Sequence, residues 1–257
     1  MVSVSPQARS RVGLALFFLL GAVALFWVTL PSTRRFQTAN PTTTALIEAR
    51  AREAKDKGRP ARRNQHWVPI GAISPWLQRA VVNSEDARFF EHDGIDVEQT
   101  KIAFSSAVED GHFGRGASTI TQQLAKNLWL GEERTVWRKL REYFLARRLE
   151  DLGKRRVLEL YLNVAEWGDG IYGAEAAARA WFNKPALELS PEESSVLAAM
   201  LPAPRRRNPQ HPDVRLRKRA FEILALYGMY EQLTPEQLED SRARLADMLG
   251  APMAAAR

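Results

Sequence analysis

The sequence predicts an all-α domain. From Trp67 onward, apolar residues recur at helical spacing, and no convincing run alternates polar and apolar residues as a strand would. A serine or threonine followed by proline marks the capped first turn of a helix. Such starts occur at Ser74-Pro75, Ser190-Pro-Glu-Glu193 and Thr234-Pro-Glu-Gln237. With 257 residues and 45% hydrophobic content, the chain can bury one sizeable core or two modest ones.

The net charge indicates which partners to expect, and the cysteine content excludes two kinds of chemistry. The formal net charge is +7, so an anionic partner is expected: a nucleic acid, lipid headgroups or a phosphorylated substrate. The chain has no cysteine, which excludes disulfides and thiol catalysis and leaves the compartment open.

An apolar stretch near the N-terminus predicts a transmembrane helix at residues 12–31. No charged residue lies between Arg11 and Arg34, and Trp27 sits near the outer end, where interfacial aromatic residues are common. A cleavable signal peptide is the alternative, but its apolar core would usually be shorter and no small-x-small cleavage site follows. A retained anchor is therefore favoured. Arginines flank both ends, so charge alone does not decide the orientation.

Residues 32–66 are expected to form a juxtamembrane linker. Its charged part, residues 48–58, fits a short helix above the lipid headgroups, where basic side chains gain from anionic lipid. A plain solvated linker fits equally well, and both interpretations remain open.

A dense polar stretch follows the helix that starts at Ser74. Glu85 and Asp86 fall near the end of that helix, close to His92 and two phenylalanines. Large apolar neighbours can desolvate a carboxylate, raise its pKa and make it a useful base. The alternative is a helix end with solvated acids and a capping histidine.

A helix is expected at residues 97–108, and a glycine-rich connection at 111–116. The next helix, residues 119–129, is predicted to be capped by Ser118. Thr119, Gln122 and Lys126 share one of its faces. That row suits the wall of a cleft for polyhydroxy and anionic groups, and it would suit bulk solvent too.

Five motifs in order resemble those of the peptidoglycan glycosyltransferases, glycosyltransferase family 51. Together they cover residues 67–212, which is more than half of the chain. They are Glu85-Asp-x-x-Phe-x-x-His-x-Gly94, Gly116-x-Ser-Thr-Ile-Thr-Gln-Gln-x-x-Lys-Asn127, Arg138-Lys-x-x-Glu142 with Leu158-Glu-x-Tyr-Leu-Asn163, Gly170-Ile-Tyr-Gly-x-x-x-Ala-Ala178, and Leu197-Ala-x-x-Leu-Pro-x-Pro204.

The resemblance implies a lysozyme-like glycosyltransferase domain at residues 67–212. The closing helices, within residues 213–257, have no assigned function. The implied reaction is polymerisation of lipid II, with inversion at the anomeric carbon and release of undecaprenyl pyrophosphate. The chain ends at Arg257 without room for a transpeptidase domain, so the resemblance is to the monofunctional, membrane-anchored form. It also implies a cytoplasmic segment at residues 1–11 and a periplasmic catalytic domain at the inner membrane.

This reaction needs one base and several cations, because pyrophosphate leaves as a stabilised anion and requires no general acid. The resemblance implies that Glu85 is the catalytic base and that Lys126 and Arg134 bind pyrophosphate. Glu142 matches a second essential glutamate, which would organise the phosphate site or a divalent metal. Arg138 lies four residues from both Arg134 and Glu142, so a plain surface ion-pair ladder remains open for it.

Other matched residues complete the predicted site. Gln122 is the glutamine expected on the Lys126 face, and His92 is expected to be a structural hydrogen-bonding residue. Ile102 departs from the family pattern, where an arginine is expected, which leaves a phosphate contact by Lys101 open. The substrate-binding set is completed by Ser118, Thr119, Gln122, Gln123, Asp86 and Asn127.

A loosely held divalent cation, Mg²⁺ or Mn²⁺, is the expected cofactor, and no organic cofactor is expected. The spacing of histidines and acids does not match a closed zinc site. The expected partners are lipid II, the growing glycan strand and inner-membrane lipid. Cell-division or wall-synthesis proteins are further candidates, and nucleic acid is not expected.

Two other functions would explain part of the sequence. A peptidoglycan-cleaving, lysozyme-like enzyme would explain one glutamate but not the cationic phosphate set. An inactive membrane-tethered scaffold that binds lipid II would not require Glu85 and Glu142 to be present.

Overall fold

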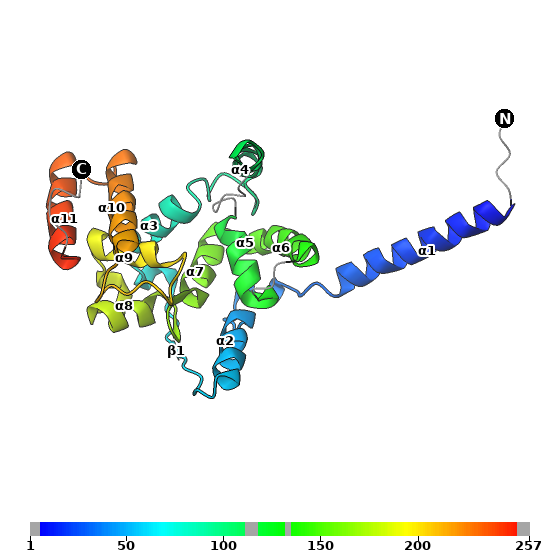
Figure 1. Ribbon diagram of the computed structural model, residues 1–257, viewed down its shortest axis with the longest axis horizontal. Helices are drawn as coiled ribbons and strands as arrows, with labels where there is room; N and C mark the ends of the chain where they lie inside the picture. Colours follow the sequence, from blue (N-terminus) through cyan, green and yellow to red (C-terminus); the bar gives the residue numbers. More distant parts are fainter. Residues whose placement is uncertain (1–5, 111–117, 132–134, 251–257) are drawn as a thin grey trace.

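The computed structural model describes residues 6–110, 118–131 and 135–250. This part of the chain is mostly helical, as predicted (Figure 1). The helices are α1 (Pro6–Val28), α2 (Ala45–Asp56), α3 (Pro75–Glu85), α4 (Val97–Asp110), α5 (Ile120–Ala125), α6 (Val136–Leu149), α7 (Lys154–Val164), α8 (Ala174–Phe182), α9 (Pro191–Met200), α10 (Val214–Met229) and α11 (Pro235–Met248).

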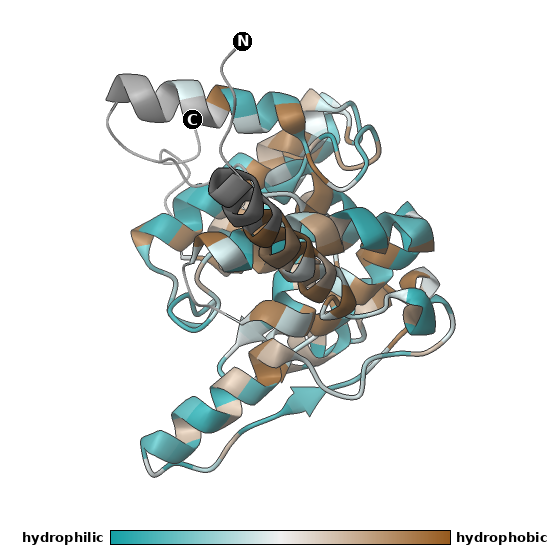
Figure 2. Ribbon diagram, turned by 90° about the vertical axis from the view of Figure 1, so that its right-hand side faces the viewer, coloured by the Kyte–Doolittle hydropathy of each residue, from teal (hydrophilic) through white to brown (hydrophobic). Residues whose placement is uncertain are grey.

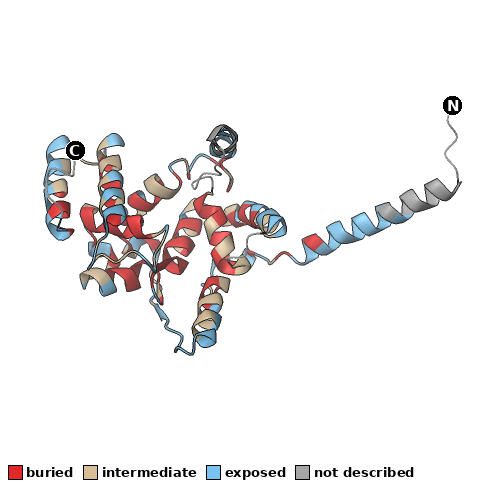
Figure 3. Cartoon of the chain, viewed as in Figure 1, coloured by how far each residue is buried: buried red, intermediate tan, exposed pale blue. Residues whose placement is uncertain are grey.

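The core is built in two adjoining regions. In one, α9 packs against α3, α10 and α11, and its residues from Glu192 to Met200 are all buried (Figure 3). In the other, α5 packs against α6 and α7, with Ile120 and Leu124 fully buried. The end of α3 lies beside the start of α5, where the N–H of Ile120 donates to Oδ2 of Asp86 at 2.9 Å, and the pocket described below is found there.

Helix α1 extends away from the rest of the molecule (Figure 1) and is largely apolar over its described residues (Figure 2). Phe26 near its end is buried against Trp137 and Phe144 of α6, with ring centroids 5.0 Å and 5.4 Å away. Over the residues that the structure describes, no helix combines the length and hydrophobicity needed to cross a membrane. The transmembrane helix at residues 12–31 stays a prediction.

The segment predicted as a juxtamembrane linker contacts the domain. Phe36 is buried, and its carbonyl oxygen accepts a hydrogen bond from Arg156 at 2.8 Å. The charged part forms α2, whose Arg50 pairs with Glu166 at 3.0 Å. Residues 48–56 are therefore helical and bound to the domain, which excludes the plain solvated linker.

A small sheet was not predicted. Its strands are β1 (Asn64–Gln65), β2 (Glu166–Gly168) and β3 (Ile171–Tyr172), in the order β1-β3-β2. β1 pairs parallel to β3, and β2 pairs antiparallel to it. Strands of two or three residues are too short to show an alternating pattern, so sequence periodicity could not reveal them.

The capping signals predicted three helix starts correctly. Ser190 and Thr234 form the expected capping boxes of α9 and α11, and Ser74 caps α3. The cap predicted at Ser118 was wrong, because Thr119 is the N-cap of α5. That helix also changes at Lys126 into a π-helical turn, Lys126–Leu130, instead of continuing as an α-helix.

The turn before α8 provides a test of the fold. Gly173 has a φ of +85°, and an added Cβ would lie 2.8 Å from the carbonyl oxygen of Asn163. We expect Gly173→Ala to lower the free energy of unfolding by about 2 kcal/mol, seen as a lower thermal midpoint. Gly71→Ala is the control, because an added Cβ there meets no atom within 4 Å. Equal midpoints for the two variants would contradict this description.

Candidate active site

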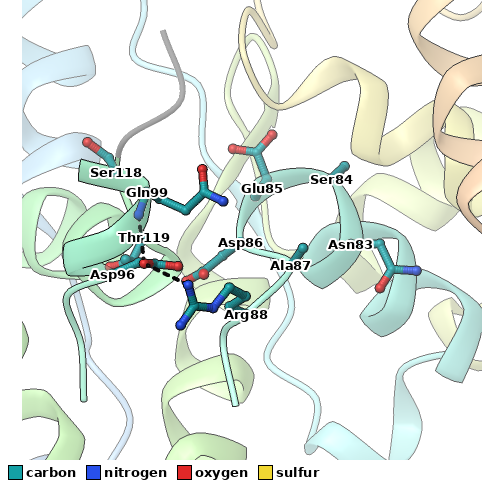
Figure 4. A pocket seen from close by; sticks show the side chains of 10 residues that line it. All are labelled: Asn83, Ser84, Glu85, Asp86, Ala87, Arg88, Asp96, Gln99, Ser118 and Thr119. Carbon is teal, nitrogen blue, oxygen red and sulfur yellow. Dashed lines mark hydrogen bonds and ion pairs between the residues drawn. The ribbon is translucent and has the colours of Figure 1, made fainter. Parts of the chain in front are cut away.

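A pocket at the end of α3 contains several of the predicted site residues. It has a volume of about 180 Å³ and opens where α3 meets the starts of α4 and α5 (Figure 4). Glu85, Asp86, Ser118 and Thr119 are the predicted residues that line it. The other lining residues are Asn83, Ser84, Ala87, Arg88, Asp96 and Gln99.

Glu85 is the last residue of α3, and its carboxylate is part of a chain of hydrogen bonds. Nε2 of Gln123 donates to Oε2 of Glu85 at 2.9 Å. The hydroxyl of Tyr161 in turn donates to Oε1 of Gln123 at 2.8 Å. Side chains from α3, α5 and α7 are thereby linked at one point.

Burial raises the pKa of the Glu85 carboxyl above its ordinary value of 4.5. The hydrogen bond from Gln123 and the positive charges of Arg219 and Arg207 act in the opposite direction, while the neighbouring Asp86 carboxylate adds to the increase in pKa. Because desolvation is the largest contribution, the net shift is upward. A carboxylate with a raised pKa has the basicity that proton abstraction requires.

Tyr161 fixes the orientation of the Gln123 side chain. Burial raises the pKa of the Tyr161 hydroxyl well above its ordinary value of 10.0, so the group is a donor at neutral pH. The Tyr161 hydroxyl donates its hydrogen bond to Oε1 of Gln123, so the amide nitrogen of Gln123 is the atom that faces Glu85. In the sequence, Tyr161 is one position of the third motif, and no role was predicted for it.

Asp86 is turned away from Glu85 and anchors the surrounding backbone. The two side chains point in opposite directions from the end of α3 (Figure 4). Oδ2 of Asp86 accepts the N–H of Ile120 at 2.9 Å, and Oδ1 contacts Nε2 of His92 at 2.9 Å. His92 is thus the structural hydrogen-bonding residue that was predicted, and it is buried.

The two glutamines of the motif have different positions. Gln122 closes the capping box, because its Oε1 accepts the N–H of Thr119 while the Thr119 hydroxyl accepts the N–H of Gln122. Gln123 is the one that reaches Glu85. The expected helical face favoured Gln122, but with Thr119 as N-cap the side chain of Gln122 folds back to the helix start.

Lys126 and Asn127 lie in the π-helical turn that follows α5. Lys126 is partly buried and Asn127 is buried. The turn closes where the N–H of Gly131 donates to the carbonyl oxygen of Lys126 at 3.2 Å. Turns of this kind are frequent at functional sites. Arg134, the other predicted pyrophosphate-binding residue, lies outside the described residues.

Glu142 gathers cationic side chains on α6. Its carboxylate is buried and pairs through Oε2 with Arg138 and through Oε1 with Lys139. Nζ of Lys139 also lies 3.3 Å from the hydroxyl of Ser118, which lines the pocket. The ion pair left open for Arg138 is therefore present. Lys139 was missed, although its place three residues before Glu142 could have indicated the contact.

Two arginines from later in the chain also add positive electrostatic potential at Glu85. Arg219 of α10 donates to the carbonyl oxygen of Ser84 at 3.0 Å, and Arg207 donates to the carbonyl oxygen of Ala199. Both lower the pKa of Glu85. The motifs gave no signal for Arg219, because it lies beyond them in the sequence.

The departure at Ile102 falls on an exposed position of α4. Its side chain is exposed, and the neighbouring Lys101 pairs with Glu98 at 3.2 Å. Neither residue lines the pocket. A phosphate contact by Lys101 stays a prediction.

Known proteins resemble this chain over most of its length. The sequence model of the transglycosylase family matches residues 52–227. A biosynthetic peptidoglycan transglycosylase of Nitrosomonas eutropha is 45% identical over 192 residues, covering 74% of this chain and 78% of that protein. Proteins with the same name match from Rhodospirillum centenum, at 44% identity over 86% of this chain and 91% of that one, and from Thiobacillus denitrificans, at 48% over 65% and 72%.

Removing the Tyr161 hydroxyl should change the titration of Glu85. In Tyr161→Phe, the Gln123 amide is no longer held with its nitrogen toward Glu85, so the carboxylate loses stabilisation and its pKa rises further. The pKa is measured by ¹³C NMR of carboxyl-labelled glutamate. Tyr227→Phe is the control, because that buried hydroxyl donates to the carbonyl oxygen of Trp76 at 2.6 Å. An unchanged or lower Glu85 pKa in Tyr161→Phe would count against the positioning role.

Proposed function

The chain belongs to the transglycosylase family, and we propose that it is a peptidoglycan glycosyltransferase that polymerises lipid II during cell-wall synthesis. The observation that carries this proposal is the pocket-lining carboxylate of Glu85, whose pKa is raised by burial and whose position is fixed by Gln123. A base of this kind is what activation of a sugar hydroxyl requires.

In the proposed reaction, the 4-hydroxyl of an acceptor GlcNAc attacks the anomeric carbon of the donor MurNAc. The new glycosidic bond forms as the bond to undecaprenyl pyrophosphate breaks, with inversion at that carbon. Glu85 takes the proton of the attacking hydroxyl. Because the pyrophosphate departs as a stabilised anion, no proton has to be delivered to it.

The departing negative charge needs cations held in place before the reaction. We assign this role to Lys126, at the start of the π-helical turn, and to Arg134. Arg138 and Lys139 add positive charge on α6, where Glu142 orients both of them. Glu142 thus serves the reaction through its neighbours, which is consistent with the second essential glutamate that the resemblance implies.

The polar residues around Glu85 fall into two groups in this proposal. Ser118 lines the pocket and would contact the sugars, as would Asn127 from the π-helical turn. Thr119 also lines the pocket, but its hydroxyl already donates to the carbonyl oxygen of Gly94 and accepts the N–H of Gln122. Asp86 and Gln122 support the site instead, because their side chains fix the first turn of α5. Gln123 positions the base.

We further propose that α1 anchors the protein in the inner membrane and that the catalytic domain is periplasmic. Support comes from the exposed apolar side chains of α1 and from its contact with α6. Helix α6 exposes Val136, Trp137, Leu140 and Tyr143 beside that contact, a surface suited to lipid. A lipid-linked donor would then reach the pocket from the membrane. Binding of cell-division or wall-synthesis proteins stays a prediction.

The position of Asp86 does not fit the second carboxyl of a two-carboxylate glycoside hydrolase. Glycoside hydrolases generally use two carboxyl groups that both face the scissile bond. Asp86 is the acid next to Glu85, but it is buried, points the other way and is bonded to Ile120 and His92. It is therefore a poor second catalytic carboxyl.

Loss of the base should abolish polymerisation. We expect Glu85→Gln to lower the rate of glycan-strand formation from purified lipid II by about three orders of magnitude or more, because base and positioning are lost together. Glu91→Gln is the matched control, since that exposed carboxylate in the same stretch pairs only with Arg88 among the described contacts.

The product gel also distinguishes the rival activity. Long strands from the wild type and none from Glu85→Gln support the proposal. Wild-type rates in a folded Glu85→Gln protein would overturn the assignment of the base, and shortening of an added glycan would favour a hydrolase.

A further inference from the structure

A second pocket lies between α2, the turn that joins β2 to β3, and the segment that follows α9. It has a volume of about 130 Å³, and it shares no lining residue with the pocket at Glu85. In Figure 1, α2 and β1 lie at the bottom of the view, whereas α4, beside the Glu85 pocket, lies at the top. Its charged lining residues are Arg50, Glu53, Arg59, Arg62, Asp169 and Arg205.

This second pocket carries positive charge. Four arginines and two carboxylates line it, so its net charge is +2. Lys57 and Glu166 each pair with a lining residue from outside the pocket, and their opposite charges leave that balance unchanged. A concave site with an excess of guanidinium groups attracts an anion.

The arginines of the pocket differ in how far the carboxylates already engage them. Arg205 pairs with Glu53 at 2.7 Å, and Arg50 pairs with Glu166 at 3.0 Å. Arg62, by contrast, contacts Asp169 only at 4.0 Å, and its side chain is 75% exposed. The guanidinium of Arg62 therefore stands at the mouth of the pocket, where an anion can reach it.

The hydroxyl of Tyr172 is a buried donor without a partner in the described part of the chain. Tyr172 belongs to β3, lines the pocket and is 0% exposed, so it forms the inner wall. Burial raises the pKa of this hydroxyl well above its ordinary value of 10.0, and the Glu166 carboxylate adds to the increase, so the proton stays on the oxygen at neutral pH. Buried donors nearly always have an acceptor. A ligand in the pocket that offers an oxygen supplies the missing one.

The arrangement of donors indicates the kind of anion. Tyr172 comes from β3, whereas Arg59 and Arg62 come from the segment between α2 and β1, so hydrogen bonds are offered from more than one direction. A carboxylate has two oxygens in one plane, whereas a phosphate group has three or more acceptor oxygens in a tetrahedral arrangement. The pocket is smaller than the cavities that enclose drug-sized ligands, which suits a single group of this size.

We propose that this pocket binds a phosphate group, with the Tyr172 hydroxyl and the guanidinium groups of Arg59 and Arg62 as donors. The phosphate belongs either to a small soluble compound or to the headgroup of an anionic lipid. Because the donors come from the end of α2 and from the small sheet, a bound phosphate ties α2 to the domain. Binding to the folded state alone also stabilises that state.

The test is calorimetric titration of inorganic phosphate into the full chain in micelles of a non-ionic detergent, with the thermal midpoint measured alongside. We expect saturable binding and a midpoint that rises with phosphate. Tyr172→Phe and Arg62→Gln should each weaken binding at least about tenfold, because each removes a hydrogen bond to a charged group. Without phosphate, Tyr172→Phe should unfold no earlier than the wild type, since its hydroxyl has no partner to lose.

Two controls separate this pocket from other parts of the molecule. Tyr227→Phe removes a buried hydroxyl that donates to the carbonyl oxygen of Trp76, and it should bind phosphate as the wild type does. Lys126→Ala should also keep the binding, because Lys126 does not line this pocket. Loss of all phosphate binding in Lys126→Ala would place the anion at the Glu85 pocket and overturn the proposal.

The source of the phosphate is decided by repeating the titration in mixed micelles that contain phosphatidic acid. Competition with inorganic phosphate at the Tyr172-dependent site assigns a lipid headgroup, and the absence of competition assigns a soluble compound. The proposal is overturned if the folded wild type shows no saturable phosphate binding, or if Tyr172→Phe and Arg62→Gln both bind as the wild type does. No lipid II is present in these titrations, so a failure to polymerise it would leave the result unaffected.

Discussion

Desolvation of the Glu85 carboxylate is the interaction on which the rest of the site depends. Withdrawing a negative charge from water is unfavourable unless nearby groups compensate it. Here the compensation is partial: Gln123 donates one hydrogen bond, and Arg207 and Arg219 contribute positive charge from farther away. The part of the desolvation cost that these groups do not offset keeps the pKa of Glu85 above its ordinary value. Helices α3, α5, α7 and α10 must all be placed correctly for this balance to exist.

The same pocket region separates negative from positive charge. Glu85 and Asp86 lie at the end of α3, whereas Arg138 and Lys139 are gathered on α6 by the buried carboxylate of Glu142. Ser118 joins the two sides, because its hydroxyl lines the pocket and lies 3.3 Å from Nζ of Lys139. A reaction that takes up a proton at one end and releases an anion at the other matches this arrangement.

Local signals in the sequence predicted much of this structure, but contacts between segments that are distant in the sequence could not be predicted. Helical spacing and caps located the helices, and the motif resemblance pointed to Glu85, which lines the pocket and has a raised pKa. The role of Gln123 was missed because the start of α5 was placed one residue too early. The contact between Tyr161 and Gln123 could not be predicted from local sequence, because only the packing of α7 against α5 brings the Tyr161 hydroxyl to Gln123. The approach of Asp96 to Asp86 likewise depends on a turn that periodicity does not describe.

The central claim is tested most directly by how stability depends on pH in the wild type and in Glu85→Gln. A carboxyl whose folded-state pKa exceeds its ordinary value of 4.5 contributes stability that is fully present below that value and is lost as pH rises through the folded-state pKa. From about pH 4 to about pH 8, the thermal midpoint of the wild type should therefore fall relative to that of Glu85→Gln. A constant difference across this range, or a wild type that gains relative stability as pH rises, would contradict the account.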